Sequence, residues 1–264
     1  MTDPTEELAT NGATIVREFL SPDEIANLRR TVDDIYDCMK SCQHFTNQLF
    51  GETFRAWQGV WLKHLRAFLH KTRPDLDIRY EKSLQVIEAQ VKRLIGQEWK
   101  FYAKRSYFRR HFGTAKQVPW HIDADAAAIY IAAAVINVWL PLDEVGAELP
   151  SLDIVPRSHA VMRKLPLLAG KDRYREDAFA ANIGKPSTPQ LRPGDALVFD
   201  QFLLHRTQRT GSASAIRTAC EFRFFRPSLP TFHGTSGWVR AGWNLLVAGD
   251  GLLAAKAKAV LGGK

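Results

Sequence analysis

The sequence is poor in cysteine and has no long apolar run. It contains only three cysteines: Cys38, Cys42 and Cys220. An odd count this low does not make a disulfide framework, and it predicts a reducing compartment. The longest apolar-rich stretch, residues 126–142, is interrupted by an asparagine and a proline, so no membrane-spanning helix is expected. The acidic first residues lack the apolar segment of a signal peptide. We therefore expect a cytoplasmic protein without a membrane partner.

The chain also lacks any block of five or six like charges. Its net charge is +8 at pH 7 and its isoelectric point is near 9.5. A basic balance can suit nucleic acid or an anionic small ligand, but without a basic block we expect no nucleic-acid partner. No Gly-x-Ser-x-Gly sequence is present, which argues against a serine hydrolase. A small-molecule partner faced by a few arginines agrees with this composition.

The first 99 residues carry the patterns of helices. Ser21, followed by Pro22 and two acids, is a helix start with serine as N-cap and proline at the first position. Apolar residues at spacings of three and four follow it. The same pattern recurs over residues 53–70 and 76–96, and Gly96 is expected to end the second of these helices. The tail from residue 238 onward is rich in alanine and leucine and is also expected to be helical.

Residues 100–226 instead carry the patterns of short strands separated by glycine and proline turns. The runs cover residues 100–110, 129–142, 151–155, 196–200 and 216–225. Such strands favour a β-sandwich or jelly roll. The predicted fold is α+β, in one domain over residues 1–264. We expect a mainly helical part over 1–99, a double-stranded β-helix (jelly-roll, cupin-like) core over 100–226, and a C-terminal tail over 227–264.

The triplet His121-Ile122-Asp123 is the first candidate for chemistry. Residues i and i+2 of an extended segment point to one side, so this imidazole and carboxylate could hold one metal ion. Two histidines and one carboxylate leave open positions on the metal, which suits ferrous oxygenases. A lone His-x-Asp triplet arises by chance and is more often a surface turn. His205, at the end of a later strand, is a candidate for the distant third ligand.

Several stretches, taken in order, resemble the phytanoyl-CoA dioxygenase family of iron(II)- and 2-oxoglutarate-dependent oxygenases. Residues 120–123 are similar to the family's first metal motif, and residues 137–145 to the strand and turn that follow it. Residues 152–159 resemble its Pro-Gly-Ser-His turn, with Arg157 in the glycine position, and residues 191–197 the turn before the distal histidine. Each match alone is unspecific, but their order across roughly residues 100–226 makes the combination specific.

This resemblance implies three iron ligands: His121, Asp123 and His205. It also implies an arginine, Arg217, that pairs with the far carboxylate of 2-oxoglutarate, and a neighbouring hydroxyl, Thr207, that assists it. A planar guanidinium grips a carboxylate through two charge-assisted hydrogen bonds, which agrees with that role. Arg223, on the same side of the strand as Arg217, is the alternative anchor.

Other candidates share faces of the predicted strands. One side of the strand before the metal motif carries Arg105, Tyr107 and Arg109. The family has a residue on that strand that contacts the co-substrate, and we name Tyr107 as the candidate for that contact. Asn137 is the second such candidate. Three residues are candidates for the substrate pocket: Trp139, Asp125 and Arg157. His159 is expected to hold its turn rather than a metal, and we expect substrate choice to depend on residues 160–187 and the N-terminal helices.

The implied function is hydroxylation of an unactivated C–H bond of a small molecule, using Fe(II), 2-oxoglutarate and O2, with release of succinate and CO2. No catalytic residue is expected beyond the metal centre. Asp123 favours hydroxylation or desaturation, because related halogenating enzymes lack the metal carboxylate. Two alternatives are a non-oxidative metal-dependent cupin-type enzyme and a catalytically inactive binding module. Arg217 and Thr207 argue against the first, and the intact ligand set argues against the second.

Overall fold

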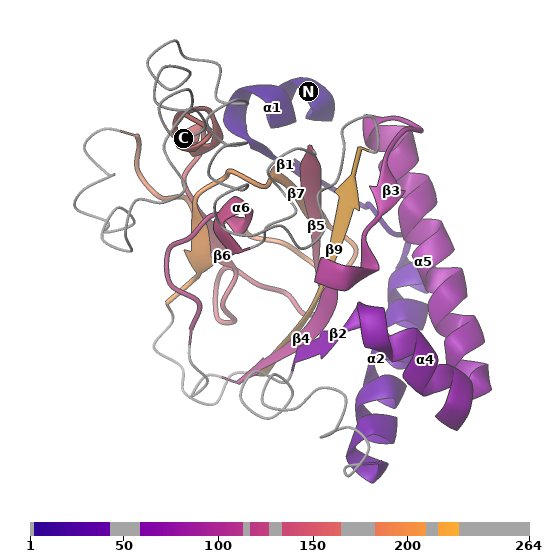
Figure 1. Ribbon diagram of the computed structural model, residues 1–264. Helices are drawn as coiled ribbons and strands as arrows, with labels where there is room; N and C mark the ends of the chain where they lie inside the picture. The colour runs from indigo at the N-terminus through magenta and orange to yellow at the C-terminus, as the bar shows by residue number, and fades with distance from the viewer. Residues whose placement is uncertain are drawn as a thin grey trace, which may run out of the picture.

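The structure, a computed structural model, describes residues 3–42, 59–112, 117–126, 134–164, 183–209 and 216–226. Figure 1 shows its helices beside and above a twisted sheet. The helices are α1 (Pro4–Asn11), α2 (Pro22–Ser41), α4 (Leu62–Thr72), α5 (Pro74–Ile95), α6 (Asp123–Ala126), α7 (Ser158–Met162) and the 3-10 turn η1 (Ala103–Arg105). The strands are β1 (Ala13–Val16), β2 (Gly59–Trp61), β3 (Lys100–Phe101), β4 (Tyr107–Phe112), β5 (Val135–Pro141), β6 (Leu152–Ile154), β7 (Ala196–Asp200), β8 (His205–Thr207) and β9 (Ile216–Phe225).

The strands form two antiparallel sheets. The larger has seven strands in the order β1-β7-β5-β9-β4-β2, with β3 paired to the last residues of β9. The smaller contains β6 and β8. Neighbouring strands such as β5 and β9 are far apart in sequence, so the sheets are built by crossovers rather than by simple hairpins. This confirms the predicted α+β fold with a jelly-roll core.

Side-chain alternation separates the two faces of the large sheet. On β5, Ile136, Val138 and Leu140 are buried in the main apolar core, whereas Asn137 and Trp139 point to the opposite face. Strand β9 follows the same rule, with apolar residues on the core side and charged residues on the other. One face of the sheet therefore binds helices, and the other is available for chemistry.

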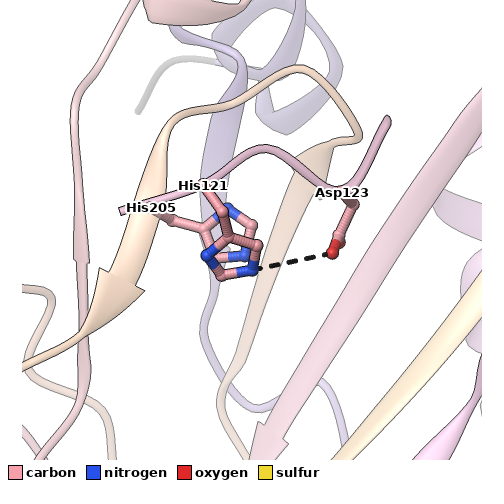
Figure 2. A group of neighbouring side chains, drawn as sticks. All are labelled: His121, Asp123 and His205. Carbon is pink, nitrogen blue, oxygen red and sulfur yellow. Dashed lines mark ion pairs between the residues drawn. The ribbon is translucent and has the colours of Figure 1, made fainter. Parts of the chain in front are cut away.

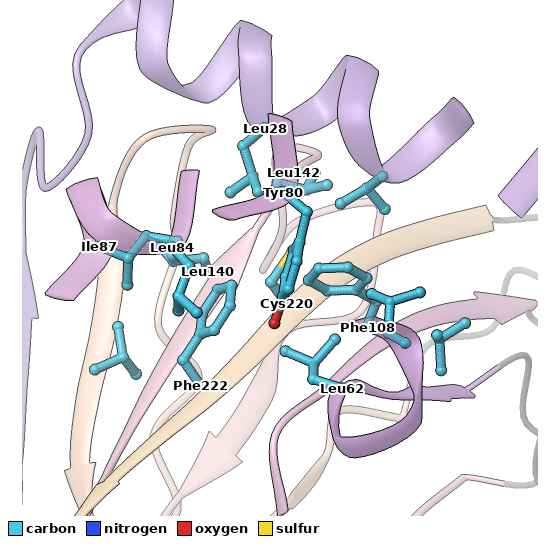
Figure 3. Packing of buried hydrophobic residues seen from close by; sticks show 14 of the residues in the cluster. Leu28, Leu62, Tyr80, Leu84, Ile87, Phe108, Leu140, Leu142, Cys220 and Phe222 are labelled. Carbon is cyan, nitrogen blue, oxygen red and sulfur yellow. The ribbon is translucent and has the colours of Figure 1, made fainter. Parts of the chain in front are cut away.

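Helices α2, α4 and α5 lie together on the core face (Figure 1). Figure 3 shows their side chains meeting those of the sheet, with Leu28 from α2 near Leu142 and Ile87 from α5 near Leu140. All four are buried. Burying one such side chain contributes about 1.5–3 kcal/mol, so this layer supplies a large part of the free energy that holds the sheet against the helices.

The predicted start of α2 is confirmed in detail. The Ser21 hydroxyl accepts a hydrogen bond from the Glu24 backbone, and the Glu24 carboxylate accepts one from the Ser21 backbone. This reciprocal capping box satisfies two donors that a helix start leaves open. Gly96 ends α5, as predicted, at φ 111°.

Two expectations from the sequence are wrong. Residues 59–61 form strand β2 rather than the continuation of a helix, because they pair with β4. The run 100–110 is not one strand: η1 interrupts it, so Arg105 does not share a strand with Tyr107 and Arg109. The N-terminal part also contains β1, which pairs with β7 at the sheet edge. The predicted tail helix, residues 53–58 and most of the stretch 160–187 lie outside the described residues.

Among the residues that the structure describes, no helix is both long and apolar enough to cross a membrane.

Candidate metal centre

The backbone holds His121 and His205 opposite one another. The N–H of each donates to the carbonyl of the other at 3.0 Å, in an isolated antiparallel bridge. Residues paired in this way carry their side chains on the same side. The two imidazole centroids consequently lie 4.2 Å apart. A short β-bridge thus brings together two histidines that are far apart in sequence.

Hydrogen bonds to the chain fix how the two rings present their nitrogens. Nδ1 of His121 lies 2.8 Å from the Pro119 carbonyl, and Nδ1 of His205 lies 2.9 Å from the Leu203 carbonyl. A carbonyl only accepts, so each Nδ1 carries the proton and each Nε2 keeps its lone pair. Histidine metal ligands are usually held in this arrangement.

Both rings are neutral near pH 7. Burial and the neighbouring His205 lower the pKa of His121 to about 4. Burial likewise lowers the pKa of His205, although Asp123 opposes that effect. Neutral imidazole is the form that binds a metal, so the site does not have to lose protons from its histidines before it takes up a cation.

Asp123 completes the group (Figure 2). One ligand atom from each of His121, Asp123 and His205 lies within 4.8 Å of the others, and Nε2 of His121 is 3.9 Å from Oδ1 of Asp123. From the spacing we expected Asp123 to lie on an extended segment, but it does not. It is the first residue of α6, whose Ala124 N–H donates to the Gln201 carbonyl at 3.1 Å. This turn directs the carboxylate back toward the imidazoles.

The carboxylate of Asp123 is suited to a cation. The residue is 4% exposed, and its Oδ2 accepts no hydrogen bond from any described residue. Leaving a buried acceptor without a partner costs about 1–3 kcal/mol, a cost that a bound cation would remove. Burial alone would raise the pKa of Asp123, but Arg223 and the two histidines lower it, so the group is ionised. Two nitrogens and one oxygen form a donor set that fits ferrous iron.

Arg217 lies on the same face of the sheet, on β9. It is 2% exposed, and its Nη1 donates to the Pro150 carbonyl at 2.8 Å. Its guanidinium carbon lies 5.1 Å from the centre of the Trp139 ring. Its Nε has no hydrogen-bond acceptor among the described residues. Burial, and then the charge of Arg109, lower its pKa to about 9, so it remains a cation at neutral pH and attracts an anion.

Arg223, the alternative anchor, is engaged differently. Its Nη2 donates to Oδ1 of Asp123 at 3.0 Å, and the same group contacts the Glu221 carboxylate. Its Nη1 donates to the Arg105 carbonyl. Tyr107 does not present its hydroxyl freely to a ligand, because that hydroxyl donates to Oε2 of Glu221 at 2.5 Å. The geometry therefore separates the two arginines that the sequence left as alternatives.

A cavity of about 240 Å³ contains the ligand atoms and opens between the two sheets. Its walls include the three ligands and Arg217, Thr207, Tyr107, Trp139, Arg105, Arg109, Arg206, Arg223, Glu221, Trp61, Val118, Leu152 and Ala219. Thr207 is buried on β8, opposite Leu152 in the β6–β8 register. Arg217 approaches the carbonyl of the preceding residue, Ser151, at 3.4 Å. Metal ligands, an arginine and a threonine thus line one cavity.

The other predicted site residues are less central. Asn137 is fully buried opposite Arg223 in the β5–β9 register, behind the cavity rather than in its wall. Arg157, expected at the mouth, precedes α7 at φ 69°; its backbone N–H donates to the Asn11 carbonyl at 2.7 Å, and its Nε lies 3.5 Å from the Asn11 side chain. His159 is tied to the Ala9 carbonyl at 3.2 Å, in agreement with a structural role. The Asp125 side chain lies outside the described residues.

Sequence reasoning missed Glu221, Arg206 and Trp61. Glu221 had a usable signal, since strand alternation places it on the face of Arg217 and Arg223. Arg206 pairs with Asp153 at 2.8 Å and gave no comparable signal. Trp61 could not be found, because β2 itself was not predicted.

Comparisons with known proteins agree with this geometry. Residues 8–219, most of the chain, match the family model described as phytanoyl-CoA dioxygenase (PhyH). A comparison with curated protein sequences gives no match.

Several solved structures share the fold at low identity. EctD from S. alaskensis, solved with 2-oxoglutarate and 5-hydroxyectoine, is 14% identical, with 91% of this chain and 83% of that chain covered and a TM-score of 0.62. AviO1 from Streptomyces viridochromogenes is 20% identical over 87% and 96%, with a TM-score of 0.56. The epimerase SnoN, solved with Fe3+, alpha ketoglutarate and nogalamycin RO, is 15% identical over 95% and 87%, with a TM-score of 0.57. The family match over most of its length shows that the chain belongs to the phytanoyl-CoA dioxygenase family and is an iron- and 2-oxoglutarate-dependent oxygenase.

Proposed function

We propose that this enzyme hydroxylates an unactivated C–H bond of a small-molecule substrate, with iron held by His121, Asp123 and His205 and 2-oxoglutarate anchored by Arg217 and Thr207. One observation carries the proposal: a ligand triad with inward-facing Nε2 atoms shares a cavity with a buried arginine whose Nε meets no acceptor in the part of the chain that the structure describes. A metal triad alone would suit many reactions, and the arginine adds the means to hold a dicarboxylate.

Each part of the cavity has a separate task in this scheme. Iron(II), if held by the triad with 2-oxoglutarate and dioxygen, would supply the oxidising chemistry that converts 2-oxoglutarate to succinate and CO2. His121 and His205 offer neutral nitrogens and Asp123 one negative charge, which leaves room on the metal for the co-substrate. Arg217 pairs with the far carboxylate, and Thr207 donates to its remaining lone pair. Apolar walls such as Leu152 exclude water and strengthen these charge interactions.

The proposed outcome, hydroxylation, has less support than the roles of the metal and the co-substrate. Among the structural relatives, SnoK is described as a carbocyclase and SnoN as an epimerase, so the fold accommodates several outcomes. Hydroxylation is favoured here because Asp123 keeps a carboxylate at the metal, where related halogenating enzymes have none. A non-oxidative cupin-type reaction would not need Arg217 in the cavity wall, and an inactive binding module would not need the intact triad of His121, Asp123 and His205.

Co-substrate binding and turnover test the proposal. Calorimetry of the full chain with Mn2+, a redox-inert stand-in for iron, should show 2-oxoglutarate binding that disappears without the metal. With ferrous iron and labelled dioxygen, slow uncoupled turnover should place one labelled oxygen in succinate. Metal binding without 2-oxoglutarate binding would leave the non-oxidative alternative, and absence of both would leave the binding module.

A substrate screen by mass spectrometry tests the outcome. A product that gains one oxygen atom from labelled dioxygen supports hydroxylation. A product that loses two hydrogens, or that changes only in stereochemistry, would replace hydroxylation by desaturation or epimerisation while leaving the metal and co-substrate roles intact.

We also propose one domain over residues 1–264, a cytoplasmic location and no nucleic-acid partner. The single domain is supported by β1 and β2, which join the N-terminal part to the sheet through β7 and β4. The location rests on the three cysteines, all free thiols. Retention on immobilised DNA at physiological salt would contradict the expected absence of a nucleic-acid partner.

A further inference from the structure

Arg223 contacts a proposed metal ligand directly. Its Nη2 lies 3.0 Å from Oδ1 of Asp123, and both side chains are 6% exposed. A charge-assisted bond of this kind, away from water, is among the stronger hydrogen bonds in proteins and is directional. It restricts rotation of the Asp123 carboxylate, whose Oδ2 is left without a hydrogen-bond donor among the described residues.

Arg223 is itself held from several sides. Its Nη2 contacts Oε1 of Glu221, and its Nη1 donates to the Arg105 carbonyl. Its backbone N–H donates to the Ser106 hydroxyl at 2.8 Å. The guanidinium carbon lies 5.5 Å from the centre of the Tyr107 ring, and the Tyr107 hydroxyl donates to Glu221 in turn. The result is a continuous chain, Tyr107–Glu221–Arg223–Asp123, that ends at the metal site.

We propose that Arg223 is a positioning residue for the metal site: held by Glu221 and Tyr107, it fixes the Asp123 carboxylate in the orientation that binds metal together with His121 and His205. This inference rests on the proposed metal role of that triad. It also assigns Tyr107 and Glu221 a task that the sequence did not suggest, the support of the arginine rather than contact with 2-oxoglutarate.

Electrostatics alone would suggest the opposite effect. A guanidinium beside a divalent cation is repelled by it, so removing Arg223 should then tighten metal binding. Glu221 answers this objection, because its carboxylate lies against Arg223 and offsets part of that positive charge. Burial raises the pKa of Glu221, and the charge of Arg223 opposes that rise. What remains is orientation of the carboxylate, and the loss of partners that orient a metal ligand typically weakens metal affinity 10- to 100-fold. The two views differ in sign, and an experiment can separate them.

The experiment titrates Co2+ into the metal-free full chain without 2-oxoglutarate, by calorimetry and by the visible absorption of the bound ion. Arg223→Met, which keeps the bulk and removes every donor, should weaken Co2+ binding about 10- to 100-fold and alter the absorption band that reports on coordination. Arg223→Lys, which keeps one donor and the charge, should recover part of that loss. Unchanged or tighter binding in Arg223→Met, or no recovery with lysine, would overturn the proposal.

Glu221→Gln tests the supporting end of the chain and remains informative if the arginine variants do not fold. It should weaken Co2+ binding roughly threefold to tenfold, the equivalent of one hydrogen bond. The effect should vanish in an Arg223→Met background, because Glu221 acts through the arginine. An equal effect in both backgrounds would mean that Glu221 acts on the ion by charge alone, against the proposal.

Arg110→Gln is the matched control. Arg110 also pairs with an aspartate, Asp33, at 2.5 Å and lies 4.3 Å above a tyrosine ring, Tyr36, but on the opposite face of β4. Its loss should leave Co2+ affinity within about twofold of the parent protein. If the unaltered protein bound no Co2+ at all, the proposed metal role of the triad would be refuted. Co2+ binding that does not change in the Arg223 variants would refute only the positioning role.

Discussion

Replacing Arg217 by methionine should separate co-substrate binding from folding. Arg217 is 2% exposed, and its Nη1 donates a hydrogen bond to the Pro150 carbonyl at 2.8 Å. Its Nε has no acceptor among the described residues, so that edge can serve an incoming carboxylate. Methionine fills most of the volume but offers neither charge nor donor. The change therefore removes the proposed anchor while it leaves an apolar side chain that can pack against Trp139 in place of the guanidinium.

The expected loss follows from the desolvated ion pair. Removing one partner of a buried charge pair costs about 3–5 kcal/mol, because the other charge stays buried and unpaired. At 1.4 kcal/mol per tenfold, this weakens 2-oxoglutarate binding by roughly two to three and a half orders of magnitude. Stability should change far less. Burial lowers the pKa of Arg217 to about 9, which shows that burying the cation is unfavourable without an anion. Its removal then offsets the lost bond to Pro150, which is worth about 1 kcal/mol.

Calorimetry with Mn2+ and urea unfolding of the metal-free protein measure the two effects. Arg217→Lys should fall between parent and methionine, since an ammonium keeps the charge but not the fork. Metal affinity should be unchanged, because Arg217 touches none of the three ligands. A loss of 2-oxoglutarate affinity below tenfold in a folded Arg217→Met protein would refute the anchor role. A larger loss in Arg223→Lys, measured with Mn2+ at a concentration that saturates the metal site of that variant, would transfer the role to Arg223.

Three further outcomes are expected. His205→Ala should lower Co2+ affinity by at least a hundredfold while leaving the fold intact, as calorimetry and circular dichroism can show. Removing a residue that only orients a metal ligand already weakens binding by up to that factor. Metal-free protein should lose stability to urea as pH falls from 7 toward 4. The pKa of His121 is lowered to about 4 in the folded protein, against roughly 6.5 in the unfolded chain. Between these values the unfolded chain binds one proton more, so acid favours unfolding, and His121→Gln should make the free energy of unfolding depend less on pH. Phe222→Ala should cost about 3–5 kcal/mol in urea unfolding, because it empties a buried site beside Phe108 in the core of Figure 3, and a cost under 1 kcal/mol would mean that the core collapses around it.

Much of the fold could be predicted because it depends on local patterns. The cap at Ser21, the stop at Gly96 and the apolar spacing between them are physical causes that act within a few residues. Strands β1 and β2 have no such signal. Each is three or four residues long and is formed by pairing with a distant strand, so its cause lies outside its own sequence. The break at η1 was missed for the same reason, since β3 and β4 both pair with β9 but at different ends.

The site shows a similar division between identity and geometry. His121, Asp123 and His205 could be found as a set, because their residue types and order carry the family resemblance. Their arrangement has a cause that the triplet does not contain. The imidazoles are placed by a two-residue bridge to β8, and the carboxylate by the start of α6. The extended i, i+2 geometry expected for the triplet is therefore absent, although the three residues do lie together.

The two arginines of β9 show where strand periodicity stops being informative. Arg217 and Arg223 occupy the same face, so alternation predicts that both reach the cavity, and both do. Their roles differ because of what lies opposite. Arg223 faces Asp123 and Glu221, two buried carboxylates that come from different elements, and its charge is neutralised within the protein. Arg217 faces carbonyl groups and a tryptophan ring, which accept hydrogen bonds or stack without cancelling a full charge. A buried cation of this second kind is stable in a folded protein when an anion arrives to meet it, and 2-oxoglutarate brings a carboxylate. The assignment therefore depends on the charge balance around each guanidinium, a property of the tertiary structure that no spacing along β9 contains.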